Sequence, residues 1–258
     1  MIFKVFSEGT ALGNQAMVIP CSDLNQLPNT EKNSTQPLVT AFCYIQEKSF
    51  RTDSSVSVRW IGKQGDIQFC GHGALALACF LDNQDLLSQA QTLCFPAGQY
   101  FLKKAAGYYW FCGLSDYEFS PCKLPQLEQI AATNKIVEVF ECMGDSGYII
   151  MRFGDDIDLR TISPNLTRLK ATTKQALIIT SAISNNPDFD YSLRYFAPQH
   201  GDSEDPATGS ANEIAAKFWH PRLKKNKMRC FQASDRGGVI NLHAENGRIW
   251  IGGKVSLI

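Results

Sequence analysis

The sequence lacks several features that would assign the protein to a class. No apolar run approaches the roughly 18 to 20 residues that span a bilayer. The start, MIFKVFSEGT, has no apolar signal-peptide core and predicts a first strand instead. The formal net charge is zero, with 25 basic and 25 acidic residues. We therefore expect neither nucleic acid nor a membrane as a partner.

Disulfide and metal patterns are missing as well. The cysteines number nine, which is odd, and no two of them form a C-x-x-C pair. We predict a reduced, cytoplasmic protein whose thiols serve mostly as small core hydrophobes. His200, His220 and His243 show no metal-ligand spacing with the cysteines, so we expect no metal ion.

The 258 residues do contain many short strand patterns and few helices. SVSVRWI, residues 55–61, alternates as a half-buried strand does. CGHGALALACFL, residues 70–81, is apolar all round and predicts a helix buried on every side. A polar stretch with two prolines lies near the middle of the chain. We place a domain boundary there, between residues 1–118 and 119–246.

The two halves share a weak internal repeat. Residues 59–61 (RWI) are followed by Cys70, eleven residues after the arginine, and by an apolar helix. Residues 194–196 (RYF) are followed by Asp205 at the same spacing and by another helix. The repeat predicts two similar halves, each with strands around one central helix. The turns before the two helices would then face each other across a cleft.

These turns suit a small anionic ligand. Gly71 and Gly73 lie at one helix start and Gly209 at the other. A helix start leaves backbone N–H groups unpaired and carries partial positive charge, and glycine lets a ligand approach the backbone closely. We therefore expect amides here to bind the carboxylate of a small substrate.

Asp205 and His72 each allow two interpretations. Asp205 followed by Pro206 fits a helix N-cap with proline at the first helical position, although the helix could instead begin nearer Ser210. His72 is either a structural residue beside a buried helix or a member of the site. A lone histidine beside a buried helix is more often structural, but its place between two glycines makes core packing less favourable, so both interpretations stay open.

Longer motifs resemble the phenazine biosynthesis PhzF-like family. Residues 70–73 (CGHG) resemble the C-G-H-A motif of that family. Residues 194–211 (RYFAPQHGDSEDPATGSA) look like its second signature nearly letter for letter. Gly13-Asn14 is similar to its opening G-N-P motif, with Gln15 in place of the proline. The matches lie in the family's order and cover most of the chain.

The resemblance implies an α+β fold like that of diaminopimelate epimerase. Each of two similar halves would be a curled, mostly antiparallel sheet around a central helix, with the active site between the halves. The last strands, about 247–258, would return to the first domain. The family's founding activity moves a proton within a dihydro-hydroxyanthranilate, without a cofactor, and its members are often dimeric. We therefore expect no cofactor, a small substrate with a carboxylate, and a chain able to form a homodimer.

The resemblance also implies the site residues. Cofactor-free proton transfer needs a base and an acid within hydrogen-bond reach of the substrate, and the motifs supply Asp205 and His72 as the catalytic pair. The implied substrate-binding residues contribute backbone or hydroxyl groups: Gly71, Gly73, Thr208, Gly209 and Ser210.

One residue of the family pattern is missing. The family's main proton-carrying glutamate belongs to an S-E-T-A-F segment, which matches residues 38–42 (LVTAF) here. Val39 stands where the glutamate should be, and valine carries no proton. Glu47 lies eight residues further on, roughly 26 Å along an extended strand. Glu31 lies in a polar loop whose path the sequence does not define.

Three functions fit these residues. The first is an isomerase whose relay is rebuilt on Asp205 and His72, or on a carboxylate not yet placed. The second is a catalytically impaired, small-molecule-binding member of the same family. The third is a nicotinamide enzyme, because residues 71–76 (GHGALA) match G-x-G-x-x-A, but no parallel βαβ unit surrounds them. A two-cysteine racemase fails because Pro206 stands where the second thiol is required. We favour the isomerase.

Overall fold

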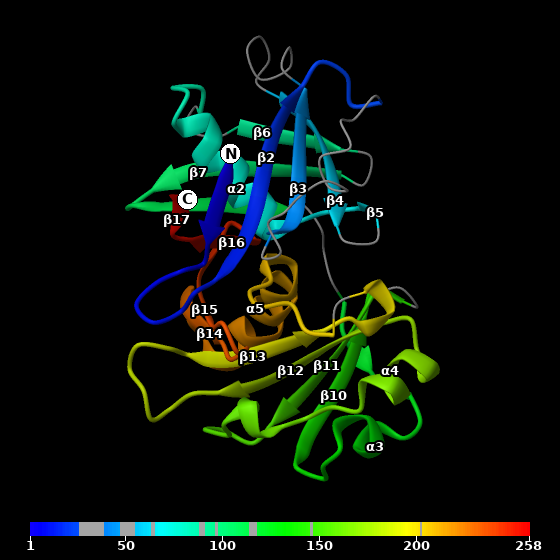
Figure 1. Cartoon of the computed structure of the whole chain (residues 1–258). Helices are drawn as coiled ribbons and strands as arrows, with labels where there is room; N and C mark the ends of the chain where they lie inside the picture. The colour runs from blue at the N-terminus through cyan, green and yellow to red at the C-terminus, as the bar shows by residue number, and fades with distance from the viewer. Residues whose placement is uncertain are drawn as a thin grey trace.

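The structure is a computed structural model. It describes residues 1–25, 39–46, 55–62, 65–87, 91–95, 98–113, 118–144, 147–201 and 203–258. Figure 1 shows two halves, one above the other, each with one long helix. The red C-terminal strands lie in the upper half, beside the blue N-terminal strand.

The strands are β1 (Ile2–Val5), β2 (Asn14–Cys21), β3 (Val39–Gln46), β4 (Ser55–Gly62), β5 (Gly65–Ile67), β6 (Gln91–Phe95), β7 (Gly98–Ala105), β8 (Tyr108–Gly113), β9 (Ser120–Pro121), β10 (Ile136–Cys142), β11 (Tyr148–Phe153), β12 (Ala176–Ala182), β13 (Tyr191–Phe196), β14 (Lys227–Gln232), β15 (Gly238–Glu245), β16 (Arg248–Gly253) and β17 (Val255–Leu257). The α-helices are α2 (Gly71–Asp82), α3 (Leu127–Ala131), α4 (Leu166–Thr172) and α5 (Gly209–Leu223). Short 3₁₀ turns, η2 and η3, cover Leu159–Thr161 and Pro198–His200.

In the first half a curled sheet wraps around α2. The strands pair in the order β17–β1–β2–β3–β4–β6–β7–β8–β16, and all pairs are antiparallel except β2–β3 and β4–β6. Helix α2 contacts β1, β2, β3, β7, β8 and β17. Residues 71–81 of the helix are all buried, because strands surround it. The prediction of a helix buried on every side is confirmed.

The second half repeats this plan around α5. Its strands pair in the order β9–β10–β11–β12–β13–β14–β15–β16, with β11–β12 and β13–β14 parallel. Helix α5 packs on β12, β14, β15 and β16. A separate apolar cluster, with Ile130 from α3 and Leu169 from α4, covers the outer face of this sheet. The predicted α+β fold, with a sheet curled around one helix in each half, is confirmed.

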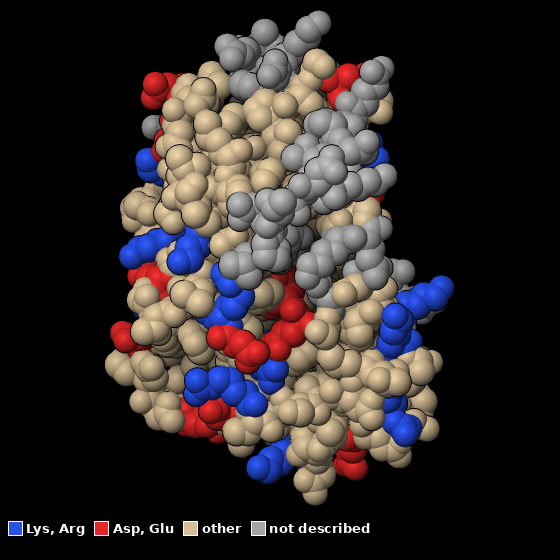
Figure 2. Space-filling model, viewed as in Figure 1, with Lys and Arg blue, Asp and Glu red and all other residues tan. Residues whose placement is uncertain are grey.

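The end of the chain joins the two halves. Strand β16 pairs with β15 on one side and with β8 on the other, and β17 pairs with β1. Residues 98–113 form the hairpin β7–β8, with positive φ at Ala106 and Gly107 in its turn. None of the helices in the described residues has the length and apolar character needed to cross a bilayer. Charges of both signs are interspersed on the face in Figure 2.

Gly13 is required where the chain turns into β2. Its φ is +63°, and a methyl group there would lie 2.0 Å from the Val5 carbonyl oxygen. We expect Gly13→Ala to destabilise the protein by at least about 2 kcal/mol, because backbone strain and a backbone clash add. Gly107→Ala is the matched control, since its φ is +77° but nothing lies within 4 Å. Urea unfolding of both variants checks this, and equal losses would contradict the clash.

Candidate active site

The central helices of the two halves meet at their N-termini. A methyl group on Gly71 would lie 2.7 Å from Gly209 Cα, and one on Gly209 would lie 2.9 Å from Gly71 Cα. The same methyl groups would lie 3.0 Å and 2.9 Å from the Phe111 ring. Each helix start brings unpaired amides and partial positive charge, so the junction concentrates donors suited to an anion. The structure thus brings together the two turns that the repeat predicts to face each other.

Asp205 lies half-buried in the extended segment ahead of α5. Its Oδ2 accepts a hydrogen bond of 2.8 Å from the Thr208 hydroxyl. Gln232 holds the backbone by donating from Nε2 to the Asp205 carbonyl at 2.7 Å. The N-cap of α5 is Thr208 and the helix begins at Gly209. The interpretation of Asp205 as the N-cap is therefore wrong, and its carboxylate is aimed by side chains instead of by helix amides.

Asn14 is a site residue that is not among those predicted from the motifs. Asn14 is the first residue of β2. Its Nδ2 donates hydrogen bonds to Oδ1 of Asp205, at 2.5 Å, and to the Ala207 carbonyl, at 3.3 Å. The side chain is 1% exposed. Asn14 thus connects the first half to the carboxylate of the second. The sequence could have indicated this residue only through the Gly13-Asn14 pair, which belongs to the opening motif.

His72 lies in the first turn of α2 and is 6% exposed. Its ring nitrogens are 3.5 and 3.6 Å from Sγ of Cys70, the N-cap of the helix. Burial lowers the pKa of His72 to about 4, so the ring is neutral at neutral pH. Burial also raises the pKa of the Cys70 thiol to about 12, against a hydrogen bond from the Gly73 amide. Cys70 is thus a neutral thiol and no nucleophile.

The depressed His72 pKa makes folding sensitive to acid. Between the ordinary pKa of 6.5 and the folded-state pKa of about 4, the unfolded chain binds the proton better. We expect the free energy of unfolding to fall as the pH decreases through this window, and to fall less in His72→Gln. Urea unfolding between pH 4 and pH 7 measures this, with the partly exposed His243→Gln as control. Identical slopes for wild type and His72→Gln would contradict burial as the cause.

Two tyrosines lie beside the start of α5. Tyr148 of β11 and Tyr195 of β13 have ring centroids 6.2 Å apart. Burial raises the pKa of Tyr148 to about 12, while a hydrogen bond with Ser210 lowers it. Burial also raises the pKa of Tyr195, with added contributions from Tyr148 and Asp205. The phenols therefore stay protonated at neutral pH and serve as hydrogen-bond donors or acceptors.

Of the remaining predicted residues, Thr208 belongs to the site and Gly73 supports the packing around it. The Thr208 hydroxyl donates to the Asp205 carboxylate. The backbone amide of Thr208 donates a hydrogen bond of 2.8 Å to Oε1 of Gln232. The Gly73 amide is occupied by Cys70 Sγ at 3.2 Å, and a methyl group on Gly73 would lie 2.8 Å from the Trp60 ring. Gly73 therefore provides room for packing.

The position of Val39 is known from the backbone pairing of its strand. It is the first residue of β3 and pairs with Gln15, next to Asn14, at a register shift in the β2–β3 ladder. Val39 thus enters the sheet beside the residue that binds Asp205. The Val39 side chain, Glu31 and Glu47 lie outside the described residues.

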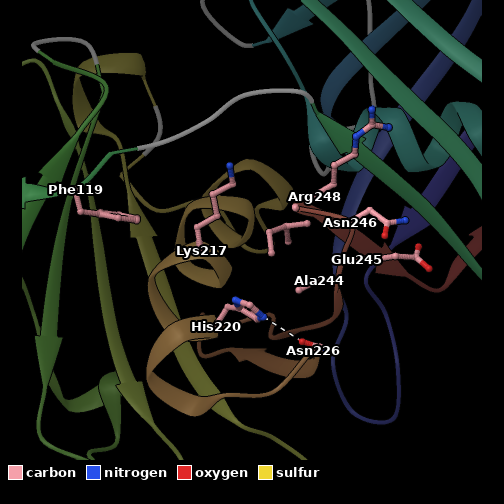
Figure 3. Close-up of a pocket in the computed structure, with 10 residues that line it drawn as sticks. Phe119, Lys217, His220, Asn226, Ala244, Glu245, Asn246 and Arg248 are labelled. Atoms are coloured by element: carbon pink, nitrogen blue, oxygen red, sulfur yellow. Dashed lines mark hydrogen bonds between the residues drawn. The ribbon is translucent and has the colours of Figure 1, made fainter.

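A separate cavity of about 430 Å³ lies at the other end of α5 (Figure 3). Phe119 forms one wall, Lys217 and His220 come from α5, and residues 244–249 come from the β15–β16 hairpin. His220 is 3.2 Å from Asn226 Oδ1. None of the predicted site residues lines this cavity. It is therefore distinct from the junction of the helices.

The comparison with known families decides the assignment. The model of the PhzC-PhzF family, described as phenazine biosynthesis-like protein, matches residues 3–256. The chain belongs to this family. The C-G-H-G and E-D-P-A-T-G-S-A segments of this phenazine biosynthesis-like chain are the ones that form the junction and the Asp205 site.

Individual relatives agree with the family. The chain is 29% identical to a phenazine biosynthesis-like domain-containing protein of Bos taurus, over 92% of this chain and 86% of that one. It is 26% identical to an uncharacterized isomerase of Pseudomonas aeruginosa, over 99% and 95% of the two chains. A PhzF family crystal structure from Enterococcus faecalis superposes with a TM-score of 0.81 at 24% identity, covering 100% and 96%. A probable proline racemase from Agrobacterium radiobacter superposes at 0.60 with 9% identity, covering 100% and 91%, which shows a shared fold.

Proposed function

We propose that the protein is a cofactor-independent isomerase that moves a proton within a small, carboxylate-bearing metabolite. The observation that carries this is the Asp205 carboxylate, fixed by Asn14 and Thr208 at the junction of two helix N-termini. The names of relatives, which include uncharacterized isomerases, support the reaction class.

The chemistry follows from the charges at the junction. The helix N-termini bind the substrate carboxylate, which orients the carbon to be deprotonated. Asp205 accepts the proton from that carbon, while the electron pair of the C–H bond stays on the substrate. Neutral His72 stabilises the resulting anion by donating a hydrogen bond, as an uncharged imidazole does. A proton delivered to another carbon completes the isomerisation.

A second candidate is a small-molecule-binding member of the family that has lost its chemistry. Val39 favours it, because this position lacks the glutamate and enters the sheet next to Asn14. Loss of one acid–base group commonly costs about 10²- to 10⁴-fold in rate. An enzyme with Val39 therefore depends on another proton-carrying group.

Deuterium exchange separates the two candidates. The protein is incubated in D₂O with a dihydro-hydroxyanthranilate, and deuterium at ring carbons is followed by proton NMR. The isomerase is expected to exchange a carbon-bound proton and to form a second isomer. Binding without any exchange supports the binding protein. If the protein neither binds the probe nor exchanges its protons, this chemical class of substrate is excluded.

Val39→Glu is the matched substitution. For the isomerase we expect the exchange rate to change by less than about tenfold, since the existing groups already carry the proton. An inactive wild type that gains exchange in Val39→Glu identifies the second candidate. We further propose a cytoplasmic location, and a homodimer that light scattering would detect.

A further inference from the structure

Gln232 is a buried polar residue to which the reaction above gives no role. It is the last residue of β14 and is fully buried. Its Nε2 donates hydrogen bonds to the Asp205 carbonyl, at 2.7 Å, and to the Thr208 hydroxyl, at 3.1 Å. Its Oε1 accepts from the Thr208 backbone amide, at 2.8 Å, and from Asn212 Nδ2, at 3.3 Å. Both hydrogens of the amide and both lone pairs of its oxygen are therefore in use.

The backbone partners fix the orientation of this amide. The Asp205 carbonyl can only accept a hydrogen bond, and the Thr208 N–H can only donate one. Exchanging the amide oxygen and nitrogen of Gln232 would leave both backbone groups buried without a partner, which is costly. Asn212 is fixed as well, because its Nδ2 also donates to the Thr208 carbonyl at 2.9 Å. Its Oδ1 accepts from the buried Tyr191 hydroxyl at 3.3 Å.

The Thr208 hydroxyl is thereby given one direction. Gln232 Nε2 carries hydrogens and accepts no hydrogen bond, so the hydroxyl oxygen must accept there. The single hydrogen of the hydroxyl is then left for Oδ2 of Asp205, at 2.8 Å. A hydrogen bond donated to a carboxylate favours its ionised form over the neutral acid. Through this hydroxyl, Gln232 favours the form of Asp205 that can accept a proton.

Titratable groups from other elements also face Asp205. Burial raises the pKa of the Cys70 thiol and of the Tyr195 phenol, and Asp205 adds to both rises. Both groups are therefore neutral at neutral pH. Glu204, the neighbour of Asp205 in the chain, is paired with Arg194 of β13 at 2.7 Å. None of these groups takes over the hydrogen bond that the hydroxyl donates.

We propose that Gln232 is a positioning residue that turns the Thr208 hydroxyl toward Asp205 and so keeps the base ionised. The proposal rests on the isomerase function, in which Asp205 accepts the proton. Gln232 acts on the base through Thr208 and transfers no proton itself. Because the same amide holds the Asp205 carbonyl, one side chain sets both the position and the charge of the base.

Carbon NMR tests this role without any substrate. With ¹³C-labelled aspartate, the Asp205 carboxyl signal is identified by its loss in Asp205→Asn, and its titration is followed from pH 3 to pH 8. Thr208→Val and Gln232→Met each remove hydrogen-bonding groups with little change of shape. We expect each to raise the midpoint by about one pH unit, because the carboxylate loses a donor. Unchanged midpoints would overturn the proposal, and Thr208→Val decides alone should Gln232→Met fail to fold.

Further variants separate this role from a loss of stability. Thr208→Ser keeps a hydroxyl and is expected to have the wild-type midpoint. Gln175 is another buried glutamine of the second half, and its Nε2 donates to the Gly144 carbonyl at 3.0 Å. Gln175→Met is expected to reduce stability and to leave the Asp205 midpoint unchanged. The double variant Gln232→Met/Thr208→Val is expected to shift no further than Thr208→Val alone. Additive shifts would overturn an action through Thr208.

The pH dependence of deuterium exchange connects the role with the reaction. With the dihydro-hydroxyanthranilate probe, the wild-type rate is expected to fall as acid protonates Asp205. In Gln232→Met we expect this fall about one pH unit higher, with probe affinity within threefold of wild type. An unshifted fall in a protein that exchanges overturns the role of Gln232 alone. A wild type that exchanges nothing overturns the isomerase function, and the positioning role with it.

Discussion

Asp205→Asn is expected to lower the deuterium exchange rate of the dihydro-hydroxyanthranilate probe by about 10²- to 10⁴-fold. Asparagine has nearly the shape of aspartate, so Thr208 keeps an oxygen to donate to. The amide removes the proton-accepting oxygen and places a donor opposite the Asn14 Nδ2 group. Chemistry is thus expected to suffer far more than folding. Exchange kinetics together with urea unfolding measure the two effects separately.

Asp188→Asn is the control for this substitution. Asp188 is exposed in the turn before β13. Its backbone N–H donates a hydrogen bond of 2.9 Å to Oδ1 of Asn186. We expect wild-type exchange in this variant. Asp205→Asn with a rate within tenfold of wild type would show that another group is the base and would end the assignment of Asp205.

The glycine pair at the helix junction gives the second large effect. Gly209→Ala places a methyl group 2.9 Å from both Gly71 Cα and the Phe111 ring. Backbone cannot move aside as a flexible side chain does, so α2 and α5 must separate. We expect a loss of about 1 to 3 kcal/mol in the free energy of unfolding, typical of overpacking a buried site. Probe binding is expected to weaken at least tenfold, because the amides of the two helix starts no longer converge.

Gly154→Ala is the matched control for the junction. The nearest atom to its new methyl group would be 3.8 Å away, in ordinary contact, and its backbone needs no positive φ. We expect stability within about 0.5 kcal/mol of wild type and unchanged binding. If Gly209→Ala behaved in the same way as Gly154→Ala, the close approach of the helices would have no functional role.

Local patterns explain how much of the fold the sequence predicts. The run at 70–81 is apolar on every side, which admits one solution, a helix enclosed by strands. Alternation at 55–61 and the repeat between the two halves are also local signals. The β7–β8 hairpin has a weaker local signal, because its turn is marked only by Ala106 and Gly107.

The candidate site shows where local signals end. The sequence names Asp205 from its motif, yet favours a helix cap for it, since Asp-Pro is common at helix starts. Only the fold decides against the cap, by bringing Asn14 from 191 positions away to the carboxylate. Gln232 ends a strand pattern that does not show what its side chain contacts. Its hydrogen bonds to Asp205 and Thr208 become visible only with α5 packed on β14.

The sequence by itself determined the family, the central helices and the residues of the two motifs, because these depend on neighbours within a few positions. The tertiary structure alone decided the contact of Gly71 with Gly209, the hydrogen bond from Asn14 to Asp205 and the hydrogen bonds of the Gln232 amide. Each of these joins segments far apart in the chain. Their energies depend on distance and on exclusion of water, and neither quantity is encoded in a short stretch of sequence.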